Sequence, residues 1–211
     1  MNKEWSELNK TMQAQIKKKD TYKMGIDTLF NLRRQLMQTL VSFKEDLCRE
    51  DFNAIPFINA DGYHSKTIAY SIWHIFRIED IVAHTVITED EQVFFTGNYQ
   101  VRINSPIITT GNELVKQQIA DFSKQLNLEE LYSYIFEVRE STEKILERFS
   151  YDELKWKIPD ERKGYLKSLN VVNCDEKAIW LIDYWCSKDI RGLIQMPFSR
   201  HWIMHTEACL R

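Results

Sequence analysis

Residues 68–87 have the sequence IAYSIWHIFRIEDIVAHTVI, and this stretch decides the expected fold. Its isoleucines and valines recur at so many helical positions that a helix built from it has few polar sides. Ser65 or Thr67, just before the stretch, is suited to cap the first turn. A helix that is apolar nearly all round has to be buried on several sides, so this segment predicts the centre of a helical bundle.

Further helices are expected on both sides of this segment. From about Tyr22 to Cys48, one apolar stripe follows three- and four-residue steps from Ile26 to Leu47, and the polar first twenty residues predict a lead-in helix. Capping residues and apolar patterns predict four more helices: Asn112 to Gln125, Leu128 to Phe149, Asp175 to Asp189 and, after Ser199, Arg200 to Arg211.

Turn-forming residues separate these helices. Breaks are expected at the Asn53–Tyr63 loop with its Asp61-Gly62 pair, the long Thr88–Gly111 connection, the Pro159–Gly164 segment, and at Gly192 and Pro197. Ser150 and Glu153 form the Ser-x-x-Glu pattern of a capping box, which predicts the start of a short additional helix.

The composition favours long helices over sheets. The 211 residues include only six glycines and four prolines. Together they make up about 5% of the chain, whereas glycine and proline account for roughly 12% of average usage. So few breakers leave little room for the tight turns of a sandwich or a barrel. The sequence therefore predicts an all-α protein, a four-helix bundle with extra short helices and long crossover loops, with residues 1–211 forming a single domain.

Charge and hydropathy exclude several classes of partner. The formal net charge is −3 and the isoelectric point about 6.0, whereas nucleic-acid binders normally carry a basic stripe. No apolar run approaches the ~18 residues of a membrane span, and the N-terminus lacks an apolar signal core. The four scattered cysteines include no Cys-x-x-Cys pair, which fits reduced thiols. We expect a cytoplasmic protein that binds neither nucleic acid nor membranes.

The sharpest local feature is a pair of histidines, His201 and His205, in the last expected helix. Residues four apart lie on one helix face, about 5–6 Å apart at Cβ, so two neutral imidazoles could bind one metal ion. Trp202 stands where a zinc protease would carry its catalytic glutamate, which excludes that class. A third ligand would have to come from another helix. For His74, a core histidine satisfied by a carbonyl or a tyrosine hydroxyl is the simpler interpretation.

Two other polar positions have a structural and a chemical interpretation. Glu79 falls on the apolar stripe of its helix, where a carboxylate needs a cation, and Arg33 or Arg34 could supply it. We expect a structural ion pair there rather than a general base. Cys209, four residues beyond His205, could extend the row of ligands or be a plain buried thiol.

Two segments together resemble a known family. Residues 71–80, SIWHIFRIED, resemble the second helix of the DinB-like proteins, and residues 191–205, RGLIQMPFSRHWIMH, resemble their closing segment. The DinB-like proteins are damage-inducible, metal-binding four-helix bundles. The resemblance implies an up-down-down-up bundle in which His74, His201 and His205 hold a divalent ion. Relatives include S-transferases that use bacillithiol or mycothiol and a thiol-dependent maleylpyruvate isomerase.

Two hypotheses of function follow from this resemblance. The first is a metalloenzyme in which Zn²⁺ or Ni²⁺, held by the three histidines, keeps an open position and activates a thiol or water. Its substrate would be a small molecule, such as a low-molecular-weight thiol, and its reaction S-transfer or hydrolysis, with no catalytic residue assigned. The second is a non-catalytic helical binding or stress-response module, motivated by the absence of an evident general base near the histidines.

Helix geometry favours His74 over the other histidines as the third ligand. His84 is ten residues further along the same helix, about 15 Å along its axis, and His64 lies in or beside a loop. His201 and His205 lie in the first turns of their helix and therefore near one end of the bundle. His74 can lie at the same distance from that end more easily than His84 can.

A homodimer is a separate expectation. Six tryptophans and a helix apolar on several sides would suit an interface, although a large single core would use the same residues.

Overall fold

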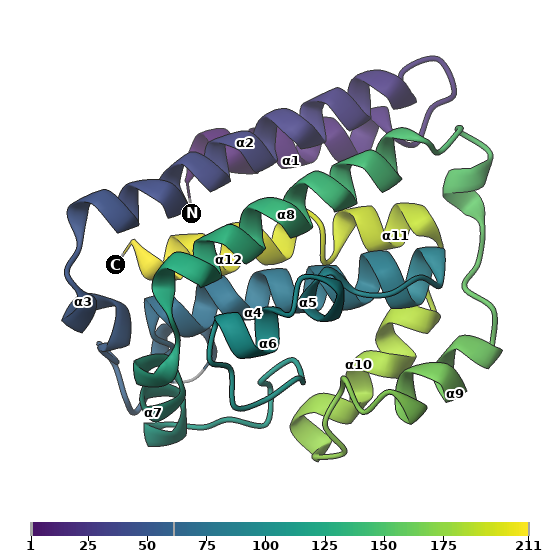
Figure 1. The fold of residues 1–211 in the computed structure, drawn as a ribbon. Coiled ribbons are helices and arrows are strands. Elements are labelled where there is room, and N and C mark those ends of the chain that lie inside the picture. Colours follow the sequence, from purple (N-terminus) through teal and green to yellow (C-terminus); the bar gives the residue numbers. More distant parts are fainter. Residues whose placement is uncertain (1, 61, 211) are drawn as a thin grey trace.

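The structure, a computed structural model, describes residues 2–60 and 62–210 (Figure 1). These residues contain no β-strand, only an isolated bridge between Lys157 and Asp189. Four helices lie side by side at the centre: α2 (Tyr22–Asp46), α4 (Ile68–Asp80), α8 (Leu128–Glu147) and α12 (Arg200–Cys209). Because α2 and α4 each contact both α8 and α12, the four helices form a closed ring of neighbours. The all-α prediction is confirmed, and this arrangement is compatible with a helical bundle.

The expected lead-in helix is present as α1 (Lys3–Gln15), and it lies along α2 (Figure 1). It contributes to the core, because Trp5 and Met12 are buried. Gly25 of α2 allows the close approach, since a Cβ there would lie 2.5 Å from Cγ2 of Ile16. Among the described residues, none of the helices combines the length and the apolar character that a bilayer span requires.

The central apolar segment is helical over its whole length, as expected. Thr67 is its cap, because its Oγ1 accepts a hydrogen bond of 3.0 Å from the backbone N–H of Tyr70. From Ile81 to Thr88 the helix widens into a π-helix, η2, a change that the apolar pattern did not predict. Residues 69–86 are all buried within this chain, so the apolar faces of the helix need no second subunit to cover them. The homodimer stays a prediction.

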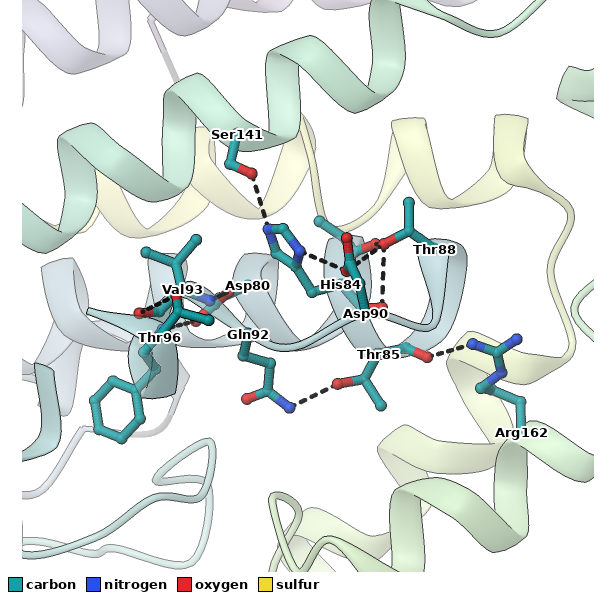
Figure 2. Close-up of polar contacts among 12 residues, drawn as sticks. Asp80, His84, Thr85, Thr88, Asp90, Gln92, Val93, Thr96, Ser141 and Arg162 are labelled. Carbon is teal, nitrogen blue, oxygen red and sulfur yellow. Dashed lines mark hydrogen bonds and ion pairs between the residues drawn. The ribbon is translucent and has the colours of Figure 1, made fainter. Parts of the chain in front are cut away.

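The long connection after this helix contains two short helices, α5 (Val93–Thr96) and α6 (Tyr99–Arg102). The buried carboxylate of Asp80 binds the start of α5, accepting bonds of 2.9 Å from the backbone N–H groups of Val93 and Phe94 (Figure 2). It also accepts a bond of 2.9 Å from the Tyr134 hydroxyl of α8. The crossover is therefore fixed to the bundle at its beginning.

The helix expected from Asn112 begins later, because α7 spans Gln117–Gln125. Gly111 has a φ of 76°, and a turn closes from the N–H of Leu114 to its carbonyl. Asn112 is part of this turn and caps no helix. The helix predicted from Leu128 is confirmed as α8, with Asn127 as its cap.

Three expected breaks differ from the structure or lie partly outside it. Pro159–Gly164 was expected to interrupt the helices, but α9 (Glu161–Ser168) includes Gly164, and Pro159 precedes its first turn, where a missing N–H is tolerated. Gly192 lies inside α11 (Ile190–Gln195), whose cap is Asp189. The 53–63 loop is bounded by α3 (Arg49–Asn53) and a 3-10 helix, η1 (Gly62–Ser65), and Asp61 lies outside the described residues.

The remaining helices begin where the sequence pattern predicts, except for the last cap, but α8 ends at Glu147 instead of Phe149 and α10 ends at Cys186 instead of Asp189. Ser150 and Glu153 exchange the two hydrogen bonds of a capping box before the 3-10 helix η3 (Glu153–Lys155). Asp175 caps α10 (Glu176–Cys186). Ser199 precedes α12, but its hydroxyl donates backwards to the carbonyl of Gln195 instead of capping the helix. The predicted end of this helix, Arg211, lies outside the described residues.

Candidate metal centre

The structure brings together His74 of α4 and His201 and His205 of α12. One nitrogen from each ring lies within 4.8 Å of those of the other two. The ring centroids are 5.1 Å apart for His74 and His201, 4.9 Å for His74 and His205, and 4.7 Å for His201 and His205. All three side chains are buried. Residues from two helices, 127 positions apart or more in the sequence, thus form one cluster of imidazoles.

The register between α12 and α4 is set by a buried ion pair beside the cluster. Glu79 of α4 accepts bonds of 2.7 and 2.9 Å from the Arg33 guanidinium and one of 2.8 Å from Nε1 of Trp202. The Arg33 guanidinium also lies 4.4 Å from the centre of the Trp202 ring. Because Trp202 follows His201 directly, these contacts hold the histidine face of α12 toward α4. The predicted pairing of Glu79 is confirmed, with Arg33 as the cation.

His74 is oriented by the loop that precedes α7. Its Nδ1 lies 2.6 Å from the carbonyl oxygen of Thr110, which can only accept, so Nδ1 carries the proton and Nε2 has a free lone pair. Tyr70 stacks on the ring with centroids 5.2 Å apart and planes at 13°. A hydrogen bond from the second ring nitrogen to a backbone carbonyl is common in histidines that ligate metals. From the sequence, a carbonyl partner for His74 was expected only if this histidine were a core residue and not a metal ligand.

The Nδ1 atoms of His201 and His205 are buried and have no hydrogen-bond partner among the described residues. Burial lowers the pKa of both imidazoles well below the usual value, and it lowers the pKa of His74 to about 4. All three rings are therefore neutral near pH 7, the form that binds a metal ion. An ion at the cluster would give His201 and His205 a partner that the protein does not supply, and it would occupy the free Nε2 of His74. The donor set thus fits a divalent metal.

A cavity of about 430 Å³ opens next to the three histidines. Its walls are mainly aromatic and include Tyr63, Tyr70, Trp180, Tyr184 and Trp185. Lys66 and Asn112 also line it, and no aspartate or glutamate of the described chain does. The sequence did not predict this cavity, because its wall combines Trp180, Tyr184 and Trp185 of α10 with residues from distant parts of the chain. Asn112, which also lines it, was expected to cap a helix.

The other candidate ligands lie outside the cluster. Both nitrogens of His84 have partners, Oδ1 of Asp90 at 2.7 Å and Oγ of Ser141 at 3.0 Å, as Figure 2 shows. His64 belongs to η1 and is not part of the group. Cys209 is also outside it, and burial raises the pKa of its thiol to about 12. Of these residues and His74, only His74 belongs to the cluster with His201 and His205, and its role as a metal ligand stays a prediction.

Comparison with models of known protein families and with curated proteins finds no match to this sequence. The structure thus defines the chain as a helical protein with a buried three-histidine cluster that could hold a metal ion.

Proposed function

We propose that this chain binds one divalent metal ion, Zn²⁺ or Ni²⁺, through His74, His201 and His205, and that it is a metal-dependent enzyme of the DinB-like type. The observation that carries the proposal is the cluster itself: three buried, neutral imidazoles with nitrogens within 4.8 Å of one another. Buried polar atoms without partners, such as Nδ1 of His201 and of His205, are costly, so the cluster is best explained by an ion that joins the three rings.

The chemistry follows from the number of ligands. Three protein ligands leave a position open, as in catalytic rather than structural zinc sites. A bound ion there would lower the pKa of a coordinated thiol or water and so supply a nucleophile, for S-transfer or for hydrolysis. The protein's own contributions are the Thr110 carbonyl, which orients His74, and the aromatic side chains, which give the cavity an apolar wall.

The proposal includes the up-down-down-up order of the four central helices. The contact between α4 and α8 together with the long segment that joins them, residues 89–127, supports this order. Neighbouring helices that run in the same direction need a long return connection, whereas antiparallel neighbours can be joined by a short loop.

Metal analysis of the untagged protein tests the metal site. We expect one divalent ion per chain. Loss of a supporting residue in metal sites costs roughly 10–100-fold in affinity, so His74→Ala and His201→Ala should each weaken binding by at least about that factor. His84→Ala is the matched control, because His84 lies on the same helical segment as His74 and outside the cluster. Its affinity should stay within a factor of two or so.

Two outcomes would contradict the proposal. Equal losses from the His74 and His84 variants would show that the ligand set is wrong. A metal-free protein whose thermal stability is unchanged by chelator would favour the non-catalytic binding or stress-response module. If metal binds, turnover is tested with an activated ester and with a low-molecular-weight thiol plus an electrophile, and His201→Ala should abolish it.

A further inference from the structure

We propose that the cavity beside the three-histidine cluster is built for an anionic small molecule, a carboxylate with an apolar or aromatic body, and that Lys66 binds its charge. The part of this inference that concerns the metal rests on the proposed function. The part that concerns Lys66 does not, because it depends only on the lining of the cavity.

The charge balance of the cavity is one-sided. Lys66 lines it, is only partly exposed, and makes no ion pair with any described carboxylate. Its Nζ lies 5.3 Å from the centre of the Tyr70 ring. Among the residues that the structure describes, no aspartate or glutamate lines the cavity, so no described carboxylate there compensates the positive charge. A partly desolvated cation without a counter-charge favours an anionic ligand.

The three histidines add to this preference. Because neutral imidazoles carry no charge, they would leave the full charge of a divalent ion uncompensated, unlike a site with carboxylate ligands. Lys66 lines the same cavity as His74, His201 and His205. A short ligand could therefore contact Lys66 with one group and the cluster with another.

The positive charge continues beyond the cavity. A neighbouring depression shares Tyr184 and Met196 with it and contains Lys188 and Arg200. Lys188 lies 4.1 Å from the centre of the Tyr184 ring, and neither cation pairs with a described carboxylate. No acidic residue of the described part of the chain lines this depression. The surface thus offers a second anionic group of a longer ligand a place to bind.

The rest of the lining determines the body of the ligand. Trp185 is buried in the wall, and Trp180, which is 49% exposed, stands at its solvent side. Aromatic walls with a few convergent polar groups are typical of small-molecule sites. Asn112 supplies one such group, because its Oδ1 is buried and has no hydrogen-bond partner. A ligand with a flat or apolar body, a carboxylate and one hydrogen-bond donor matches these features.

The experiment uses Co²⁺-loaded protein and three small thiols that differ mainly in charge: 3-mercaptopropionate, 2-mercaptoethanol and cysteamine. Binding is read from the thiolate-to-cobalt charge-transfer band. We expect 3-mercaptopropionate to bind at least about tenfold more tightly than 2-mercaptoethanol, and cysteamine to bind most weakly, because a partly buried charge pair contributes on the order of one factor of ten. Lys66→Met should remove most of the difference, and Lys66→Arg should retain it. Lys17→Met, on the exposed surface, is the matched control.

A second measurement separates this inference from the metal proposal. In metal-free protein, benzoate and benzylamine are compared by quenching of tryptophan fluorescence, and benzoate should bind more tightly in a manner that Lys66→Met abolishes. If no cobalt binds but this preference is found, the proposed function fails and the anion site stands. If thiolate bands form with equal affinity for all three thiols, or if Lys66→Met leaves the ranking unchanged, the anion site is refuted.

Discussion

Replacing Glu79 by leucine should be among the most damaging single changes in this protein. Glu79 and Arg33 are fully buried, and the carboxylate accepts bonds of 2.7 and 2.9 Å from the guanidinium. It also accepts the indole N–H of Trp202 at 2.8 Å. Leucine has a similar volume but no acceptor. The substitution therefore leaves a buried cation and a buried donor short of partners, and creates only a small change in packing.

The magnitude follows from what remains around Arg33. After the change, the guanidinium keeps Glu143 at 3.1 Å and the carbonyl of Phe198 at 3.0 Å. Removing one partner of a buried pair typically costs about 3–5 kcal/mol, whereas replacing both by apolar residues is often neutral or stabilising. We expect the single variant to lose about 3–5 kcal/mol, equivalent to roughly 6–20 °C in melting temperature for a chain of this size. The double variant Arg33→Met/Glu79→Leu should recover most of that loss.

Urea unfolding at pH 7 measures these values, and an unchanged m-value would show that the same surface is exposed in each variant. Metal affinity should fall in the single variant by tenfold or so, because Trp202 loses the contact that holds the adjacent His201 in register. The reasoning is refuted if the single variant loses less than about 1 kcal/mol, the usual value of an exposed pair. It is refuted equally if the double variant is no more stable than the single one.

Two further predictions concern the surroundings of His74. Burial lowers the pKa of His74 to about 4, whereas that of an unfolded histidine is roughly 6.5, so the metal-free protein should lose stability as the pH falls below 6.5. By pH 5, protonation of this histidine should lower the free energy of unfolding, measured with urea, by about 2 kcal/mol. A His74→Ala variant with the same pH dependence would contradict this. Gly111 has a φ of 76°, and a Cβ there would lie 3.0 Å from the Trp73 and Tyr70 rings. Gly111→Ala should therefore destabilise the protein by about 2 kcal/mol and weaken metal binding. A variant with the melting temperature and the metal affinity of the unchanged protein would disprove this prediction.

The helical elements could be predicted because their signals are local. The apolar stripe that begins at Ile26 repeats with the period of an α-helix; it forms the buried face of α2 as far as Phe43, and Leu47 follows the end of the helix. The Thr67 cap and the Ser150–Glu153 capping box depend on atoms three residues apart. Such contacts form within one or two turns, so the sequence around them is sufficient. The same locality explains the pairing of His201 and His205 on one face of α12.

Local signals failed where neighbouring elements decide the backbone. Glycine and proline indicated breaks in the 159–164 segment and at Gly192, yet α9 and α11 continue through the glycines. The cost of a glycine in a helix is only about 1 kcal/mol, which packing of the flanking apolar residues can exceed. The π-helix after Asp80 has no sequence signal of its own, and its turns are accompanied by bonds from Thr88 to the carbonyls of Ala83 and His84.

The sequence by itself determined that the chain is helical, that residues 68–87 are buried at its centre, and that two histidines share one face of the last helix. Only the tertiary structure decided that Arg33 rather than Arg34 pairs with Glu79, and that Lys66 and Asn112 share one cavity with the histidines. The physical reason is that hydrogen bonds and periodicity within a helix depend on neighbours a few residues away. Contacts between helices depend instead on their relative rotation and depth, which the packing of the whole core sets.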